Sequence, residues 1–230
     1  MGYASCVVAC KAVVVVLATP VVPSGTFIPN EALYLPVLRS EVQSHWPSAS
    51  HKSAFAAQVN QETCASLRSK KCWSPTAELK TEREYGFGLG QLTVTDKFDN
   101  FKEAKKLDPS MRDWTWENRY NAQYQLRTMV LMDKFAYGKF DWAGSEYERM
   151  AFSFAAYNGG IGGVLSDRTV CKQTTGCNPA QWFGHVEHTS KKQKVAAHGY
   201  GQSFFQINRG YVVSVMESRR ARYREFFGEK

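Results

Sequence analysis

The sequence predicts an α+β fold that is mostly helical and contains one small β element. Two observations carry this prediction. Several long stretches repeat apolar residues at helical spacing, and residues 87–94 form a short, alternating, glycine-rich stretch that is typical of a strand or turn. The chain has 230 residues, of which 43% are hydrophobic, so it can build a packed core within one large domain.

The first half of the domain is expected to hold two helices and a loop. Four prolines between positions 23 and 47 suit a linker that leads into a short helix over residues 33–45. Residues 51–65 predict a second helix, because their apolar residues recur at helical spacing and Ser50 can serve as its N-cap. Residues 66–84 are polar and are expected to form a loop.

Three further helices are expected in the second half. Residues 119–136 and 147–156 show clear amphipathic patterns. The glycines within residues 159–163 should end the second of these helices abruptly, as glycine after a helix does. Residues 211–226 predict a final helix that is rich in arginine.

The N-terminal stretch over residues 4–23 is nearly all apolar and about as long as a membrane span. Lys11 interrupts it, at a cost of about 2.5–3.5 kcal/mol if it is held in mid-bilayer. A cleavable secretory signal, a weak signal-anchor and a lipoprotein signal remain open, and a buried N-terminal strand or helix is the structural alternative. We expect residues 1–25 to direct export to the periplasm or cell envelope, where contact with the membrane through residues 4–23 is an open alternative.

The cysteines outside this stretch support export. They form two pairs that are close enough in sequence to close small loops, and neither pair has the compact spacing of a zinc site. Disulfides are therefore expected, with reduced core thiols as the alternative. The four residues are Cys64 and Cys72, and Cys171 and Cys177.

The chain is basic, with a net charge of +8 and an isoelectric point near 9.2. Such a charge predicts attraction to polyanions. The positive residues are scattered in short clusters, and no nucleic-acid-binding motif is present in the sequence. We therefore expect no nucleic-acid partner, and an anionic bacterial envelope is the better candidate.

Three short segments carry the functional information. They are Gln-Glu-Thr at 61–63, Tyr-Gly-Phe-Gly-Leu-Gly-Gln at 85–91 and Ala-Tyr-Asn-Gly-Gly at 156–160. Together they supply an acid, hydrogen-bonding amides and small residues, which are the parts that polysaccharide cleavage needs. In this order they resemble the motifs of soluble lytic transglycosylases and goose-type lysozymes, which cut peptidoglycan. The resemblance covers about residues 50–220.

This resemblance implies a lysozyme-like fold, with the small β element beside the substrate cleft. Residues 26–49 would then be a linker and entry helix, and residues 50–230 would be the catalytic domain. Acid–base cleavage of a glycan requires no metal and no organic cofactor, so none is expected. The substrate would be peptidoglycan glycan strands, and the enzyme would act as a monomer.

Glu62 is the candidate catalytic acid. A negative charge near the C-terminal end of a helix is unfavourable, and burial on an apolar helix face disfavours it further, so both effects favour the protonated form. A carboxyl group tuned in this way can protonate a leaving oxygen near neutral pH. A solvent-facing helix glutamate is the structural alternative, but the resemblance assigns the family's catalytic glutamate to this position.

The other site residues are transferred from the resemblance. Gln91 would hydrogen-bond to the glycan, while Gly88 would allow the sugar to approach closely. Tyr157 would lie near the catalytic carboxyl, and Asn158 would hold a sugar acetamide. Tyr211 would line the site. The structural alternative for Gly88 and Gln91 is an ordinary glycine-rich hairpin. For Tyr157 and Asn158 it is a helix cap, and for Tyr211 it is a core aromatic.

A second carboxylate would decide the type of reaction. Hydrolysis by inversion needs one to activate water, whereas in a transglycosylase the C6 hydroxyl of muramic acid attacks internally. One acidic position of goose-type lysozymes falls on Glu82, the other falls on Thr93, and Glu84 is a further candidate. We therefore expect a lytic transglycosylase that leaves 1,6-anhydroMurNAc ends, such as a phage endolysin, with a bacterial enzyme of envelope remodelling or secretion as the alternative role. A hydrolytic lysozyme and a non-catalytic peptidoglycan-binding module are the alternatives.

Overall fold

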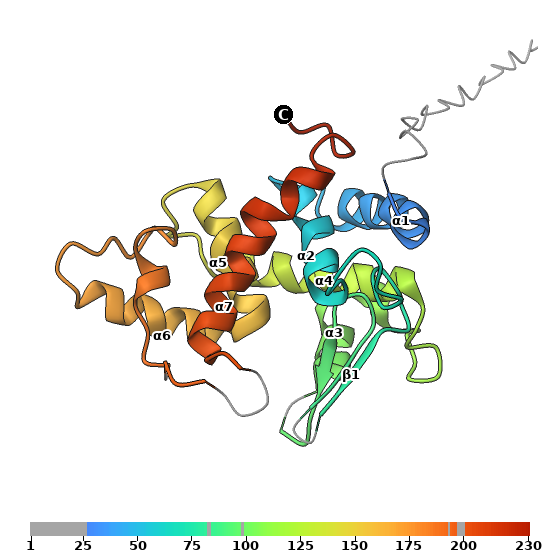
Figure 1. The fold of residues 1–230 in the computed structure, drawn as a ribbon, viewed down its shortest axis with the longest axis horizontal. Helices are drawn as coiled ribbons and strands as arrows, with labels where there is room; N and C mark the ends of the chain where they lie inside the picture. Colours follow the sequence, from blue (N-terminus) through green and yellow to red (C-terminus); the bar gives the residue numbers. More distant parts are fainter. Residues whose placement is uncertain (1–26, 82–83, 98, 193, 197–200) are drawn as a thin grey trace, which may run out of the picture.

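A computed structural model describes residues 27–81, 84–97, 99–192, 194–196 and 201–230. These residues form seven α-helices and one three-stranded antiparallel sheet, which confirms the mostly helical α+β class (Figure 1). The helices are α1 (Pro29–His45), α2 (Ser53–Thr63), α3 (Asn100–Leu107), α4 (Ala122–Tyr137), α5 (Glu146–Gly159), α6 (Ile161–Lys172) and α7 (Phe204–Val213). The strands are β1 (Glu78–Lys80), β2 (Tyr85–Phe87) and β3 (Leu92–Val94).

The N-terminal helices differ from the prediction at their starts. Helix α1 begins at Pro29 rather than at residue 33, because proline fits the first helical turn, where its missing N–H is not needed. Its first turn is closed by Ile28 N–H, which donates to Glu31 Oε2 at 3.0 Å. Helix α2 begins at Ser53 rather than at residue 51, so the expected Ser50 cap is wrong.

The glycine-rich segments also differ in detail. Residues 87–94 contain the end of β2, a turn at 88–91 and β3, in agreement with the predicted strand or turn. The loop expected over residues 66–84 contains β1 as a third strand. After α5, Gly160 has a φ of 76° and ends the helix, while the glycines that follow it already belong to α6. The last helix begins at Phe204 and changes at Ser214–Ser218 into a π-helical turn, so one continuous helix over 211–226 is wrong.

Two apolar clusters organise the molecule. The larger one joins α1, α2 and α4–α7 and includes Leu35, Phe55 and Phe154, all fully buried. The smaller one lies between the sheet, α3 and one face of α4, around Phe87 and Trp114. Figure 1 shows α5, α6 and α7 on one side and the sheet with α3 on the other, with α2 between them. The C-terminal end of α2, where Glu62 lies, therefore falls between the two groups.

The C-terminal segment (residues 211–229) holds α2 along its length. The carboxylate of Glu229 accepts hydrogen bonds from both the backbone N–H and the hydroxyl of Ser53, at 3.0 and 2.5 Å, and so caps the helix start. Farther along, Asn60 Nδ2 donates to the hydroxyl of Tyr223 at 2.8 Å. Helix α2 is thus fixed by side chains that follow it by more than 160 residues.

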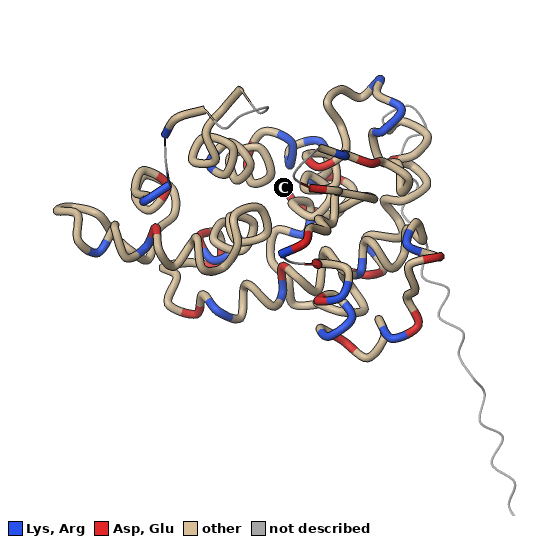
Figure 2. Tube along the Cα trace, turned by 90° about the horizontal axis from the view of Figure 1, so that it is seen from below, with Lys and Arg blue, Asp and Glu red and all other residues tan. Residues whose placement is uncertain are grey.

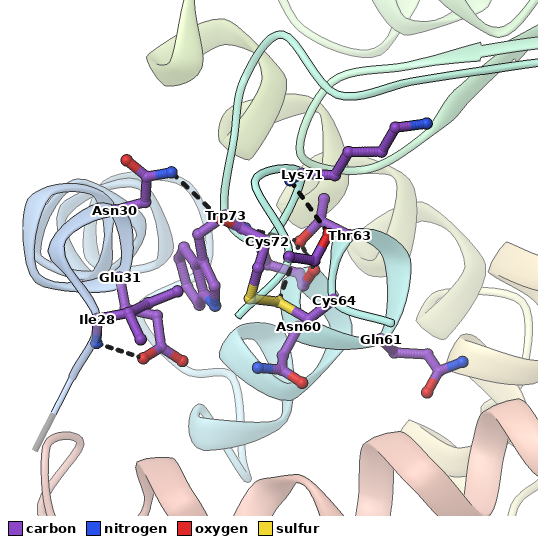
Figure 3. The surroundings of a disulfide bond; sticks show 12 residues. Ile28, Asn30, Glu31, Asn60, Gln61, Thr63, Cys64, Lys71, Cys72 and Trp73 are labelled. Carbon is purple, nitrogen blue, oxygen red and sulfur yellow. Dashed lines mark hydrogen bonds between the residues drawn. A yellow bond between two sulfur atoms is a disulfide. The ribbon is translucent and has the colours of Figure 1, made fainter. Parts of the chain in front are cut away.

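Both expected disulfides are confirmed. Cys64 is bonded to Cys72, and Cys171 is bonded to Cys177. Figure 3 shows the first bond directly after α2, with Trp73 on one side and Gln61 pointing away on the other. The Thr63 hydroxyl adds to this anchor, because it donates to Val59 O at 2.7 Å and accepts from Trp73 N–H at 3.0 Å. The end of α2 is therefore closed by covalent and polar contacts.

Acidic and basic residues are interspersed along the chain (Figure 2). Within the described part of the chain, no group of three or more His, Cys, Asp or Glu residues is arranged to hold a metal ion. No helix of the same part is long and apolar enough to cross a membrane. The predicted export segment, residues 1–25, lies outside the described residues.

Candidate functional site

The site is built around the carboxyl group of Glu62 in the last turn of α2. The Tyr211 hydroxyl on α7 donates a hydrogen bond to Glu62 Oε1 at 2.7 Å. Glu62 is partly exposed, while Tyr211 is buried. One oxygen of the carboxyl group is therefore held by the protein, while the residue keeps some access to solvent.

The surroundings of Glu62 change its acidity. Burial raises the pKa of Glu62 from 4.5 to about 7, and the hydrogen bond from Tyr211 opposes this rise. Desolvation dominates because a charged carboxylate loses more hydration than one phenol replaces. Near neutral pH the group is consequently present in both protonation states, as a general acid–base requires.

Glycines in the turn after β2 give the helices room to pack. A Cβ on Gly88, whose φ is 78°, would lie 2.4 Å from Gln125 Cδ. A Cβ on Gly90 would lie 2.5 Å from the Tyr157 hydroxyl oxygen. Gly88 was predicted to make room for a sugar, but the protein's own Gln125 already requires a glycine there.

Gln91 closes this turn with a φ of 44°. Its side-chain nitrogen donates to Gly88 O at 2.8 Å and to Ala77 O at 3.2 Å. The amide thus ties the turn to the segment before β1. Contact between Gln91 and a glycan remains a prediction. In this conformation the side-chain nitrogen of Gln91 is already bonded to two backbone carbonyls.

Tyr157, near the end of α5, hydrogen-bonds to the turn and lies near Glu62. Its hydroxyl donates to Gly90 O at 2.8 Å. Burial raises the pKa of Tyr157 well above its ordinary value, and the negative charges of Glu62 and Asp133 act in the same direction. The three predicted segments therefore do meet: Tyr157 of α5 hydrogen-bonds to the turn at 88–91 and interacts electrostatically with Glu62 of α2.

Asn158 lies beside this group and is exposed. Its Oδ1 accepts a hydrogen bond at 3.1 Å from Asn208 Nδ2, which also donates to Ala155 O at 2.9 Å. Asn208 therefore orients Asn158 from α7. This role of Asn208 was missed in the sequence.

The described candidate for a second carboxylate is Glu84. It lies between β1 and β2. Among the described groups, only burial and Tyr211 shift the pKa of Glu62, so Glu84 has no part in that shift. Glu82 lies outside the described residues, and Thr93 is in β3, where it pairs with Gly86.

Two buried polar residues of α4 were missed by sequence reasoning. Gln125 accepts from Leu89 N–H at 2.9 Å and donates to Pro75 O and Arg119 O, both at 2.9 Å, so it pins the turn to α4. Asp133 is fully buried near Glu62 and Tyr157. The signal was present, because Asp133 follows Met129 by four residues on the apolar face of its helix.

The arrangement supplies one tunable acid, a phenol that hydrogen-bonds to it and a turn shaped by glycines. Such a set can give a proton to a leaving oxygen and take one from an attacking hydroxyl. The chain matches no protein-family model and no curated protein. Its function is therefore inferred from the side chains and their contacts.

Proposed function

We propose that this protein cleaves the β-1,4 bond between MurNAc and GlcNAc in peptidoglycan as a lytic transglycosylase, with Glu62 as its general acid–base. The observation that carries the proposal is the state of Glu62. Its pKa of about 7 and its 2.7 Å hydrogen bond from Tyr211 suit a carboxyl group that must both give and accept a proton.

In the first half of the reaction, protonated Glu62 gives its proton to the glycosidic oxygen, and the bond from that oxygen to C1 of MurNAc breaks. The Tyr211 hydroxyl hydrogen-bonds to the carboxylate that forms, because its O–H donates to Oε1. In the second half, Glu62 takes the proton of the C6 hydroxyl while O6 bonds to C1. The product is a 1,6-anhydro ring, the proton is returned to Glu62, and no water is consumed.

Among the described residues, no carboxylate contributes to the pKa shift of Glu62, and this supports the transglycosylase reaction over hydrolysis. Inverting hydrolysis needs a carboxylate that activates water across the sugar ring. Within the described residues, Asp133 is the acidic group whose pKa is raised by the charge of Glu62, and it is fully buried. Glu84 has no part in the pKa shift of Glu62.

Wall degradation during lysis, as by an endolysin, is the biological role we propose. The net charge of +8 supports it, because a basic protein is drawn to an anionic envelope. Export to the periplasm or envelope is part of the proposal. The two disulfides support it, since such bonds persist in oxidising compartments.

Mass spectrometry of digested peptidoglycan tests the reaction type. The purified protein should release muropeptides with 1,6-anhydroMurNAc ends. Reducing MurNAc ends would instead assign hydrolysis, and the same site would then be that of a lysozyme. Sedimentation with intact peptidoglycan but no soluble product would assign a binding module and would refute the enzymatic proposal.

A further inference from the structure

Asp133 lies in the interior at a place where an ionised carboxylate has little support. Its relative exposure is 0%, and it belongs to the core-facing side of α4. Burial raises the pKa of Asp133 well above its ordinary value, and the neighbouring charge of Glu62 acts in the same direction. A buried carboxylate without a cation is costly, so a group in this position gains by remaining protonated.

The partner of Asp133 is the carboxamide of Gln58, one turn before Glu62 on α2. Gln58 Nε2 donates to Asp133 Oδ1 at 3.4 Å. The amide oxygen Gln58 Oε1 and the second carboxyl oxygen Asp133 Oδ2 are both buried and have no partner among the described residues. Two unpaired acceptors on adjoining side chains indicate that one proton is shared between them, since buried polar atoms are normally satisfied.

The charged and titratable groups around this pair come from three helices. Glu62 acts from α2, Tyr157 from α5 and Tyr211 from α7. Among the described residues, Glu62 is the charged group that shifts the pKa of Asp133, and none of the shifts comes from a cation. The Gln58 hydrogen bond opposes the rise but is long, at 3.4 Å.

We propose that Asp133 is a protonated positioning residue that forms a reciprocal acid–amide pair with Gln58 beneath Glu62. The Asp133 Oδ2 proton is donated to Gln58 Oε1 while Gln58 Nε2 donates to Oδ1. Both otherwise unpaired atoms are then satisfied, and α2 is joined to α4 one turn before the catalytic residue. The pair also leaves Glu62 as the one carboxyl group of this cluster that changes charge near neutral pH.

This function of the pair rests on the proposed role of Glu62. Two adjacent carboxyl groups titrate as a coupled system, and the second charge is disfavoured once the first is present. A neutral Asp133 prevents that competition, so Glu62 can cycle between its two protonation states. An ionised Asp133 would raise the Glu62 pKa further and would slow the return of the carboxylate form.

Infrared spectroscopy tests the protonation of Asp133 without using activity. At about pH 8, one unit above the Glu62 pKa of about 7, ordinary carboxyl groups and most of Glu62 are ionised. The wild-type protein should still show a carbonyl band of a protonated carboxyl group, and Asp133→Asn should lack it. No such band in the wild type, or the same band in the variant, would overturn the proposal.

The pH profile of activity tests the effect on Glu62. Asparagine mimics a protonated aspartate, since its NH₂ can donate to Gln58 Oε1 and its oxygen can accept from Nε2. Asp133→Asn should therefore keep activity within about twofold, with an unshifted midpoint of the pH profile. A midpoint moved to lower pH would mean that Asp133 is normally charged, and a loss as large as that of Glu62→Gln would make Asp133 catalytic.

Asp133→Leu is the matched control, because it leaves the Gln58 amide buried and unpaired. This variant should unfold at lower denaturant concentration than both the wild type and Asp133→Asn. If Asp133→Asn fails to fold, the proposal is refuted, since an isosteric neutral amide should be accepted. If the infrared band is present but the protein does not cut peptidoglycan, the pair stands and the proposed function fails.

Discussion

On the helical side of the candidate site, Glu62 is fixed by side chains from α7 and the C-terminal segment, and burial there changes its pKa. On the sheet side, the turn at residues 88–91 is fixed by backbone contacts and by glycines that let Gln125 and Tyr157 pack closely. Contacts on the helical side set the pKa of Glu62, whereas contacts on the sheet side set the conformation of the turn. Substitutions on the helical side should therefore change the pH dependence of activity, and those on the sheet side should lower stability.

The largest effect is expected from Glu62→Gln, which removes the transferable proton and keeps the shape of the side chain. Release of soluble muropeptides should fall by about 10²–10⁴-fold, the usual contribution of a general acid–base. Glu84→Gln is the matched control on the sheet side and should retain activity. Equal losses in the two variants would refute the assignment of Glu62 as the sole acid–base.

The same variant should change how stability depends on pH. Folding raises the Glu62 pKa from 4.5 to about 7, so its protonated form contributes stability that is complete below pH 4.5 and is lost as pH rises through about 7. Above that pH, Glu62→Gln should exceed the wild type in free energy of unfolding by up to about 2–3 kcal/mol. Denaturant unfolding at several pH values measures this difference, and parallel curves would contradict the raised pKa.

The two disulfides should separate stability from activity. They close loops with sequence separations of 8 and 6, so removing either should cost about 2–3 kcal/mol of unfolding free energy. Replacing Cys64 and Cys72 by serine should also lower activity, because Cys64 follows Glu62 by two residues. Serines at Cys171 and Cys177 should leave activity intact in the molecules that remain folded. Similar activity of the two variants would show that the first bond does not position α2.

Gly88→Ala should destabilise the turn at residues 88–91 on the sheet side. A methyl group there conflicts with Gln125, and the φ of 78° is unfavourable for alanine, so unfolding free energy should fall by about 1–3 kcal/mol. Gly162→Ala in α6 is the matched control, since nothing lies within 4 Å of its added Cβ. Chemical denaturation measures both variants, and comparable stability would show that Gln125 moves aside without cost.

The smallest effect sharpens the contrast between the two sides. Tyr211→Phe removes the hydrogen bond that lowers the Glu62 pKa, so the pKa should rise by up to about one unit and activity should persist to higher pH. Tyr157→Phe removes a bond to Gly90 O instead, and it should lower stability with little change in the pH midpoint. The pH–rate profiles of the two variants measure this difference. A larger shift of the pH midpoint in Tyr157→Phe than in Tyr211→Phe would contradict the roles given to the two sides.

Local patterns predicted much of this fold, because they act over a few residues. Helices α2, α4 and α5 and both disulfides could be predicted from helical spacing and short loops. The N-cap of α2 could not, since its hydrogen-bond acceptor is Glu229 and not Ser50. Strand β1 was missed because its burial is slight and its pairing with β2 is decided by the neighbouring strand.

The site shows the same division. Glu62 could be placed near a helix end from sequence, but its raised pKa comes from burial in the folded chain, opposed by a hydrogen bond from Tyr211, which follows it by 149 residues. Gly88 was expected to allow a sugar to approach closely, which remains a prediction, and the structure gives a second reason for glycine there, because an added Cβ would meet Gln125. Asp133 was passed over within an apolar helix, although a charged residue on such a face is itself a signal of a buried polar pair.

The contacts between α2 and the C-terminal segment have a consequence for the timing of synthesis. A growing chain makes α2 early, but Tyr211, Tyr223 and Glu229 emerge from the ribosome only much later. Until then the start of α2 lacks its cap and Glu62 lacks its hydrogen bond from Tyr211. The contacts are also of high sequence separation, which slows folding. The full set of contacts around Glu62 is therefore complete only after nearly the whole described chain has been made.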